Sequence, residues 1–280
     1  MGGGLGGRAL RAERNGGIGR GARGAETLWI AARGIRGKIA KAQAENSDFD
    51  AMWVTNAHAL YLALESHPFA RADWLAEDVD MLVSLDAPEV AREALERDLA
   101  RFPDSAALHE RLRARLLEDR GLEALEQDYE RRVAAAPSSA PLQWFAGYAS
   151  IVAAEFEKRA GENQRSKDAY GRAIQHFDKS AALDAETKDN SDHFAAMALA
   201  GRARIAMEEG DLERAVADLV AALARKPTIL ETEDGLGRTP MLTIRALRFL
   251  LDDKKRDDLR EKLEAALEEI DPDLASRPAK

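Results

Sequence analysis

Residues 196–229 read AMALAGRARIAMEEGDLERAVADLVAALARKPTI, and this stretch decides the fold. Apolar and small residues recur every three or four positions on both sides of Gly210-Asp211, which is the pattern of two amphipathic helices joined by a tight turn. Glycine adopts the left-handed backbone of such a turn at little cost, and Pro227 ends the second helix. The stretch therefore predicts an antiparallel helical hairpin, because helices joined by a short turn pack against each other.

Prolines spaced along the chain indicate that this hairpin is repeated. Pro68, Pro103 and Pro137 are 35 and 34 residues apart, and each follows a similar helix end. A period of about 34 residues with proline after the second helix is typical of the tetratricopeptide repeat. Residues 196–229 resemble that family, without its usual aromatic residues, at Ala203, Gly210-Asp211, Ala215, Leu219, Ala222-Leu223 and Pro227.

A second match lies upstream and contains an insertion. Residues 170–184 resemble the second helix of the family, with Trp144 to Tyr148 in the first helix. The distance from Trp144 to Ala173 exceeds the family spacing by about a dozen residues. We expect both helices of this hairpin to be longer and to meet at 161–164. The resemblance covers 139–227, whereas the period alone supports the hairpins before it.

Helical patterns occupy nearly the whole chain after its first residues. Ala, Leu, Glu and Arg, which favour helices, dominate the composition, whereas residues that favour strands are sparse. Twelve helices are predicted, at Ala25–Glu45, Asp48–Glu65 (opened by Ser47), Arg71–Leu85, Pro88–Arg101, Ser105–Asp119, Leu122–Ala135, Ala140–Ala160, Ser166–Leu183, Asp192–Glu209, Leu212–Arg225, Pro240–Leu251 and Lys254–Ile270.

The predicted fold is an all-α superhelix, or solenoid, of about six antiparallel hairpins. Its parts are a disordered Gly/Arg-rich tail at 1–24, an N-terminal capping hairpin at 25–67, tetratricopeptide-like repeats at 68–227 with an elongated hairpin at 139–185, a C-terminal capping hairpin at 228–270 and a disordered tail at 271–280. The first tail holds ten of the twenty glycines and cannot bury enough apolar surface to offset its chain entropy. The basic helix 25–45 suits capping, with membrane or partner docking as the alternative.

Charge and composition restrict the functional class. The net charge is −9, which divides into +7 over residues 1–41 and −16 over the remainder. An acidic body repels nucleic acid, so the alternative function, nucleic-acid association, would use the basic Arg/Gly tail. The absence of cysteine excludes disulfides and thiolate chemistry. No apolar run suits a transmembrane segment or a secretory signal, so we expect a cytoplasmic protein, of bacterial type by its Ala/Arg-rich composition.

Motifs for catalysis or metal binding are not recognised. The five histidines lack the spacing of a zinc site, and paired carboxylates such as Glu208-Glu209 point apart on a helix and are solvated. A GxGxxG pattern at 19–24 follows no strand and therefore does not indicate a dinucleotide site. Thr239 and Pro240 fit a helix start. We expect no enzyme activity, no cofactor and no metal.

The family resemblance implies a protein-binding function. In this family the first helix of each pair lines a concave face that binds peptides. Carried over by position, that face comprises Met197, Arg204, Met207 and Glu208, with Glu110, Ala114 and Glu118, and with Phe145, Ala149 and Val152. These positions lack the Lys/Asn clamp for carboxylate tails. The sequence predicts a scaffold or adaptor for a protein or peptide segment, with the oligomeric state left open. The four tryptophans are expected in the core, or one of them in a ligand groove.

Overall fold

The structure, a computed structural model, describes residues 6–271, with side chains described from residue 21. Helices form this part of the chain, which contains no strand. They are α1 (Gly6–Ala44), α2 (Ala51–Glu65), α3 (Ala72–Ser84), α4 (Pro88–Arg101), α5 (Ala106–Ala135), α6 (Ala140–Arg159), α7 (Asn163–Leu183), α8 (Lys188–Glu209), α9 (Leu212–Arg225), α10 (Pro240–Asp253) and α11 (Asp257–Glu268), with short 3-10 turns at Ala185–Thr187 and Pro227–Ile229.

Consecutive helices pack against each other from α1 to α4 and from α6 to α11, which confirms the predicted all-α array of helical hairpins. Helix α5 is interrupted at Gly121, where the backbone has φ 81° and ψ −176°. Its two halves correspond to the two helices predicted at 105–119 and 122–135. In the elongated hairpin, α6 and α7 meet at Gly161, whose φ is 82°. The insertion therefore lengthens both helices, as the sequence predicts.

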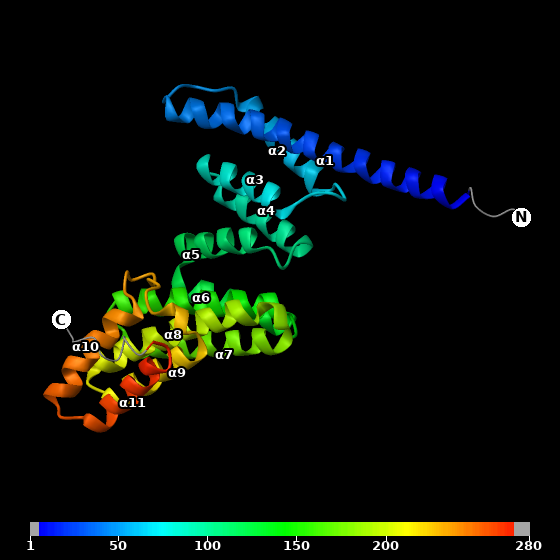
Figure 1. Cartoon of the computed structure of the whole chain (residues 1–280). Coiled ribbons are helices and arrows are strands. Elements are labelled where there is room, and N and C mark those ends of the chain that lie inside the picture. The colour runs from blue at the N-terminus through cyan, green and yellow to red at the C-terminus, as the bar shows by residue number, and fades with distance from the viewer. Residues whose placement is uncertain (1–5, 272–280) are drawn as a thin grey trace, which may run out of the picture. The chain divides into compact units, whose positions relative to one another are not determined.

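The chain divides into two compact units between Arg115 and Leu116, a boundary that the sequence analysis does not predict. In the first unit, α1 to α3 enclose a core that includes Ile39, Tyr61 and Leu75, and the indole rings of Trp29 and Trp74 stack at 4.9 Å. In the second unit, helices α6 to α11 pack in sequence (Figure 1).

The expected disordered tail at 1–24 overlaps a described helix, because α1 begins at Gly6. Arg, Ala, Leu and Glu lie between the glycines there and have high helix propensity, and adding a residue to an existing helix is far easier than starting one. The glycines of the 19–24 pattern lie within this helix and form no loop. Residues 1–5 and 272–280 lie outside the described part of the chain.

Helix ends follow local side-chain chemistry. Asp50, not Ser47, caps α2, and its carboxylate accepts a hydrogen bond from the backbone N–H of Met52. Thr239 caps α10 ahead of Pro240, as predicted. Gly210 ends α8 with φ 82°, which is the left-handed conformation expected of the turn.

Small residues let the helices of the second unit approach closely. Ala203, Ala215 and Ala222 are fully buried where α8 and α9 meet. Gly201 of α8 lies against the ring of Tyr170, and Gly147 of α6 lies against Phe177. Close approach allows the ridges of one helix to enter the grooves of the next. The close approach of these helices also holds Tyr170 and Phe177 in position.

Candidate functional site

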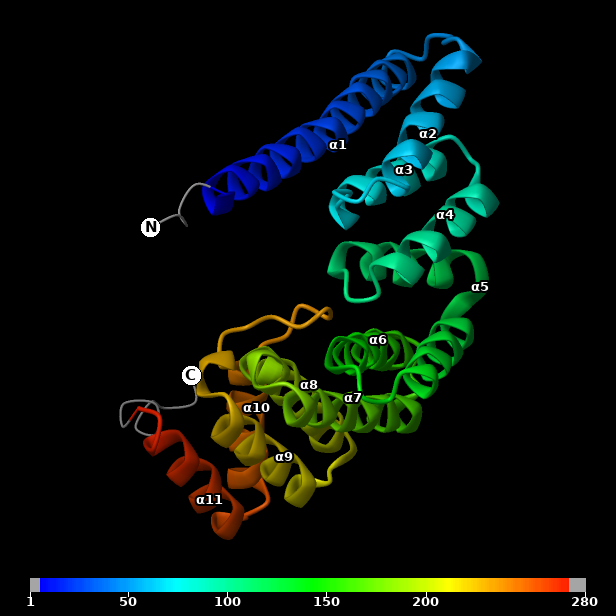
Figure 2. The same cartoon turned by 90° about the vertical axis from the view of Figure 1, so that its right-hand side faces the viewer.

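The loop between α9 and α10 folds back onto helices α6 and α8 (Figure 2). The backbone N–H of Gly235 donates a hydrogen bond to Oε1 of Glu155 at 2.8 Å, and Arg159 donates to the carbonyl of Gly235. From α8, Nη1 of Arg204 donates to Oδ2 of Asp234 at 2.6 Å. Three polar contacts therefore hold the tip of the loop against two first helices of neighbouring hairpins.

The tip has a defined shape of its own. Oδ1 of Asp234 accepts hydrogen bonds from the backbone N–H groups of Leu236 and Arg238, each at 2.9 Å. A Cβ added to Gly235 would lie 2.0 Å from Oε2 of Glu155, so a larger residue there would displace the carboxylate that holds the loop. Gly237 has φ 68°, a conformation that suits glycine. The loop is therefore a closed turn docked on the helices.

A cavity of about 140 Å³ lies between this loop and the helices. We call it the loop pocket. Its walls come from α6, α7, α8 and the loop, and its lining residues are Tyr148, Ile151, Val152, Glu155, Tyr170, His193, Phe194, Met197, Thr232, Glu233, Asp234 and Gly235. Apolar and aromatic side chains form one side, and polar groups of the loop form the other, an arrangement typical of ligand pockets.

An aromatic cluster supports the apolar wall. The ring of Trp144 stacks on Tyr148 at 5.6 Å and meets the edge of Phe194 at 5.3 Å. Phe177 stacks on Phe194 at 5.8 Å from the other side. Edge-to-face and offset contacts of this kind add about 0.5–1.5 kcal/mol per pair beyond the buried area. Tyr148 and Phe194 are thus held in place by rings that do not themselves face the pocket.

Three polar side chains, Tyr170, Glu155 and His193, also line the pocket. The hydroxyl of Tyr170 is buried beside the guanidinium of Arg204 without a hydrogen bond of regular geometry to it. Burial raises the pKa of Tyr170 and that of Glu155. Burial also lowers the pKa of His193 below its ordinary value of 6.5, so this imidazole is neutral at pH 7.

Two of the partner-binding residues predicted from the sequence meet in the loop pocket, namely Val152 of α6 and Met197 of α8. Met207 and Glu208 instead line a more open hollow of about 500 Å³ with Leu250, Lys254 and Arg256. Glu208 also forms an ion pair with Lys158 of α6. The predicted face of the second unit is therefore divided between two depressions.

Arg204 and Phe145 are buried, with 7% and 4% of their surface exposed, so the prediction that they lie on an open face is wrong. The loop covers Arg204 and pairs it with Asp234. Phe145 packs against Trp144 with ring centroids 5.5 Å apart, and its neighbour one turn on, Ala149, is buried as well. The loop and the lengthened α6 both depart from the family pattern on which the prediction rested.

The predicted residues of α5 do not form one group. Glu110, Ala114 and Glu118 are exposed on the first half of this helix. Glu110 pairs with Arg111 and belongs to the first unit, whereas Glu118 belongs to the second. Their contact with a partner stays a prediction.

The sequence analysis missed Tyr148, Tyr170, His193 and Phe194, together with the docked loop. One signal was available: the connection from 227 to 239 is longer than the turns between the other helices, and long ordered loops are often functional. The position of this loop over α6 and α8 depends on contacts between residues that are far apart in the sequence.

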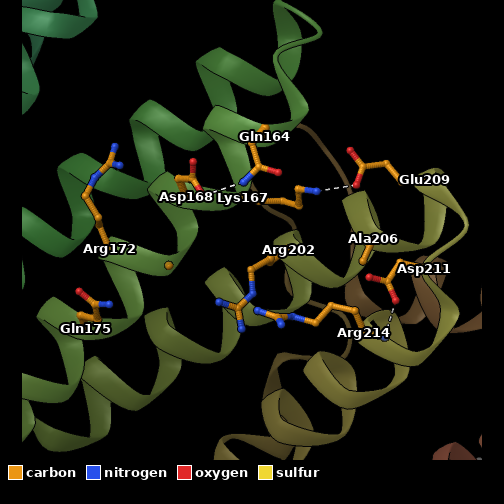
Figure 3. Close-up of a pocket in the computed structure, with 11 residues that line it drawn as sticks. Gln164, Lys167, Asp168, Arg172, Gln175, Arg202, Ala206, Glu209, Asp211 and Arg214 are labelled. Carbon is orange, nitrogen blue, oxygen red and sulfur yellow. Dashed lines mark hydrogen bonds and ion pairs between the residues drawn. The ribbon is translucent and has the colours of Figure 1, made fainter.

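A second, polar pocket lies on α7, α8 and α9 (Figure 3). There Lys167 pairs with Glu209 at 2.6 Å, and Arg202 reaches Asp218 at 2.7 Å. Arg214 approaches Asp218 at 3.5 Å. The lining holds four cations and three carboxylates, and Asp218 behind it is shared by Arg202 and Arg214, so this pocket carries an ion-pair network between helices.

Four of the histidines make local contacts in the described structure. Nδ1 of His58 lies 2.9 Å from a carboxylate oxygen of Asp78, and Nε2 of His109 lies 2.8 Å from the carbonyl of Pro103. His176 contacts Gln143, and Nδ1 of His67 accepts a hydrogen bond from a backbone N–H. His193 differs, because it lines the loop pocket.

The fold and the pocket define an all-α protein built from helical-hairpin repeats. No family model and no curated protein matches the chain. Among solved structures, one of MamA is similar at 14% identity with a TM-score of 0.34, covering 67% of this chain and 94% of that one. The MamA RS-1 ArsTM double mutant is similar at 16% identity with a TM-score of 0.32, covering 72% and 97%. At TM-scores this low, neither informs the site.

Each helix in the part of the chain that the structure describes is too short or too polar to cross a bilayer.

Proposed function

We propose that this protein is an interaction scaffold that binds a segment of a partner protein at the loop pocket and the adjoining faces of α6 and α8. The observation that carries this proposal is the apolar side of the loop pocket, where Val152 and Met197 remain partly accessible beside the docked loop. Both residues come from first helices of hairpins, the helices that bind peptides in the family that the sequence resembles.

The polar groups around the pocket support a binding function. Glu155 already accepts a hydrogen bond from Gly235, and Asp234 is held by Arg204. These carboxylates therefore position the loop, which forms one wall of the pocket. A preformed wall reduces the ordering cost of binding.

The size of the site sets the expected affinity. Burying one large apolar side chain contributes about 1.5–3 kcal/mol. A micromolar complex requires about −8 kcal/mol, so the partner segment must also contact the faces of α6 and α8 around the pocket. We expect affinities near micromolar, with the pocket as the main anchor.

Affinity enrichment from cell extract, with quantification by mass spectrometry, tests this proposal. Val152→Glu places a charge in the apolar wall and should remove the specific partner from the enriched set. Leu242→Glu, on an exposed apolar position of α10, is the matched control and should retain the partner. Both variants should keep the helical circular dichroism of the wild type. Identical partner sets for wild type and Val152→Glu would refute the assignment of the site.

A further inference from the structure

We propose that the loop pocket receives one aromatic side chain of a partner segment whose neighbouring residues are basic. This inference rests on the proposed function, which assigns a partner segment to the pocket, and adds the chemistry of that segment. Three features of the pocket carry it: its volume, the rings in its wall and the charge of its rim.

The volume suits a single ring. The cavity measures about 140 Å³. An apolar cavity of about 150 Å³ in another protein accepts benzene, so a phenyl group fits a space of this size. The pocket is too small for two large side chains, and an alanine would leave most of it empty.

The wall favours an aromatic ring over an aliphatic group. Tyr148 and Phe194 line the pocket and are held by the Trp144 cluster behind them. A ring that enters can make edge-to-face contacts with both. Met197 adds a thioether, which contacts aromatic rings favourably.

The rim carries negative charge. Glu233 lines the pocket, and Glu231 lies two residues before it. Both are exposed, and neither forms an ion pair within the described part of the chain. The loop segment 230–239 contains three acidic residues and one basic residue, Arg238.

Of the nearby cations, Arg238 of the loop forms no ion pair in the described part of the chain, so the two free glutamates, Glu231 and Glu233, leave the rim with a net negative charge. Arg204 pairs with Asp234, and Arg159 donates to the carbonyl of Gly235. Lys226 pairs with Asp189. His193 is neutral at pH 7. A basic residue beside the inserted ring would therefore meet uncompensated carboxylates, whereas an acidic one would be repelled.

Peptide titration of the 15N-labelled full chain tests the proposal through the indole N–H signals of the tryptophans. The probes are capped pentapeptides of sequence Gly-Lys-Phe-Lys-Gly, Gly-Lys-Ala-Lys-Gly and Gly-Glu-Phe-Glu-Gly. The Trp144 signal, assigned with Trp144→Phe, should shift with the Lys-Phe-Lys peptide while that of Trp29 does not. The alanine peptide should bind about tenfold more weakly and the acidic peptide about threefold more weakly.

Charge reversal provides the matched pair of variants. Glu233→Lys should weaken the binding of the Lys-Phe-Lys peptide and strengthen the binding of the acidic peptide. Glu268→Lys, an exposed glutamate on α11, should change neither. Equal binding of the phenylalanine and alanine peptides, preference for the acidic peptide, or no shift of the Trp144 signal would each overturn the proposal.

The outcome separates this inference from the function on which it rests. If Val152→Glu abolishes partner capture but the Lys-Phe-Lys peptide does not bind, the scaffold function stands and the partner chemistry is wrong. If neither effect is seen, both are wrong. A Trp144 shift that depends on protein concentration and is lost in Phe249→Ala would instead identify a second copy of this chain as the occupant, since Phe249 is 57% exposed.

Discussion

Two carboxyl groups of the first unit, Asp78 and Asp98, are buried with 4% and 2% of their surface exposed. Burial raises the pKa of Asp78 to about 6 and that of Asp98 to about 7. Glu65 raises both further, whereas the charge of Arg97 lowers both. His58 contacts Asp78, but Oδ1 of Asp98 has no hydrogen-bond partner among the described residues. Asp98 therefore destabilises the folded state when ionised.

Stability should depend on pH through Asp98. The folded residue keeps its proton up to about pH 7, whereas the unfolded residue loses it near 3.8. The folded state binds more protons between these values, so the free energy of unfolding falls as the pH rises through this window. We expect Asp98→Asn to be more stable than the wild type at pH 8 by about 1–3 kcal/mol, and equally stable near pH 4.

Urea denaturation across that pH range measures the effect. Asp104→Asn, at an exposed position, is the control and should follow the wild type. The same pH slope in the wild type and in Asp98→Asn would show that the buried carboxyl does not titrate as described.

Gly201 fixes the position of Tyr170 at the pocket. A Cβ at Gly201 would lie 2.5 Å from Cζ of Tyr170, so the ring must move. We expect Gly201→Ala to lower the free energy of unfolding by about 1–3 kcal/mol. A Cβ at Gly171 would lie an ordinary 3.8 Å from Arg202. Gly171→Ala should therefore raise the free energy of unfolding by about 0.5–1 kcal/mol, because alanine favours the helix. Chemical denaturation compares the two, and a loss in both would contradict this packing.

At the scale of the helices, the repeat alignment rests on the contact between α8 and α9. Ala215 is fully buried there, whereas Ala217 on the same helix is exposed. Ala215→Trp should overpack the hairpin and lower the free energy of unfolding by about 1–3 kcal/mol. At roughly 2–4 °C per kcal/mol, the melting temperature should fall by several degrees. Ala217→Trp should leave it nearly unchanged. Differential scanning calorimetry distinguishes them, and equal melting temperatures would argue against the alignment.

Gly121 divides α5 into two helical segments. Its φ of 81° with ψ of −176° is a conformation that is nearly restricted to glycine. Gly121→Ala should therefore cost about 1–3 kcal/mol. Gly34→Ala in α1, where nothing lies within 4 Å of the added Cβ, should be stabilising by comparison. Denaturant unfolding provides the readout, and a neutral effect of Gly121→Ala would mean that α5 can run straight.

Sequence reasoning predicted the elements better than the site. The hairpins follow from periodicity and from turn residues such as Gly210, which are local signals. Arg204 is hydrogen-bonded to Asp234, which lies thirty residues further along the chain. Glu155 accepts a hydrogen bond from Gly235, which lies eighty residues away in sequence. Neither contact leaves a periodic pattern. Val152 and Met197 were predicted because they follow the family's helix register, which the loop does not alter.

At the scale of the molecule, the chain forms two compact units with their own cores. Trp29, Trp53 and Trp74 pack in the first unit, and Trp144 packs in the second. These four indoles pack against the cores, as the sequence predicts.

The separate cores predict separate responses to mutation. Ala215→Trp, in the second unit, should lower the urea midpoint reported by the Trp144 indole signal. The midpoint reported by Trp29 and Trp74 should stay within error of the wild type, since these indoles pack against the separate core of the first unit. Equal shifts in both signals would show that the chain unfolds as one cooperative body.

Site-specific photo-crosslinking tests whether a partner segment binds at the loop pocket. Benzoylphenylalanine is placed at Val152 in the pocket and, as the control, at Asp168 in the polar pocket on α7. Benzoylphenylalanine at 152 should crosslink to one partner segment, which mass spectrometry should show to carry an aromatic residue beside a basic one. Crosslinks at 168 alone, or at neither position, would contradict binding at the loop pocket.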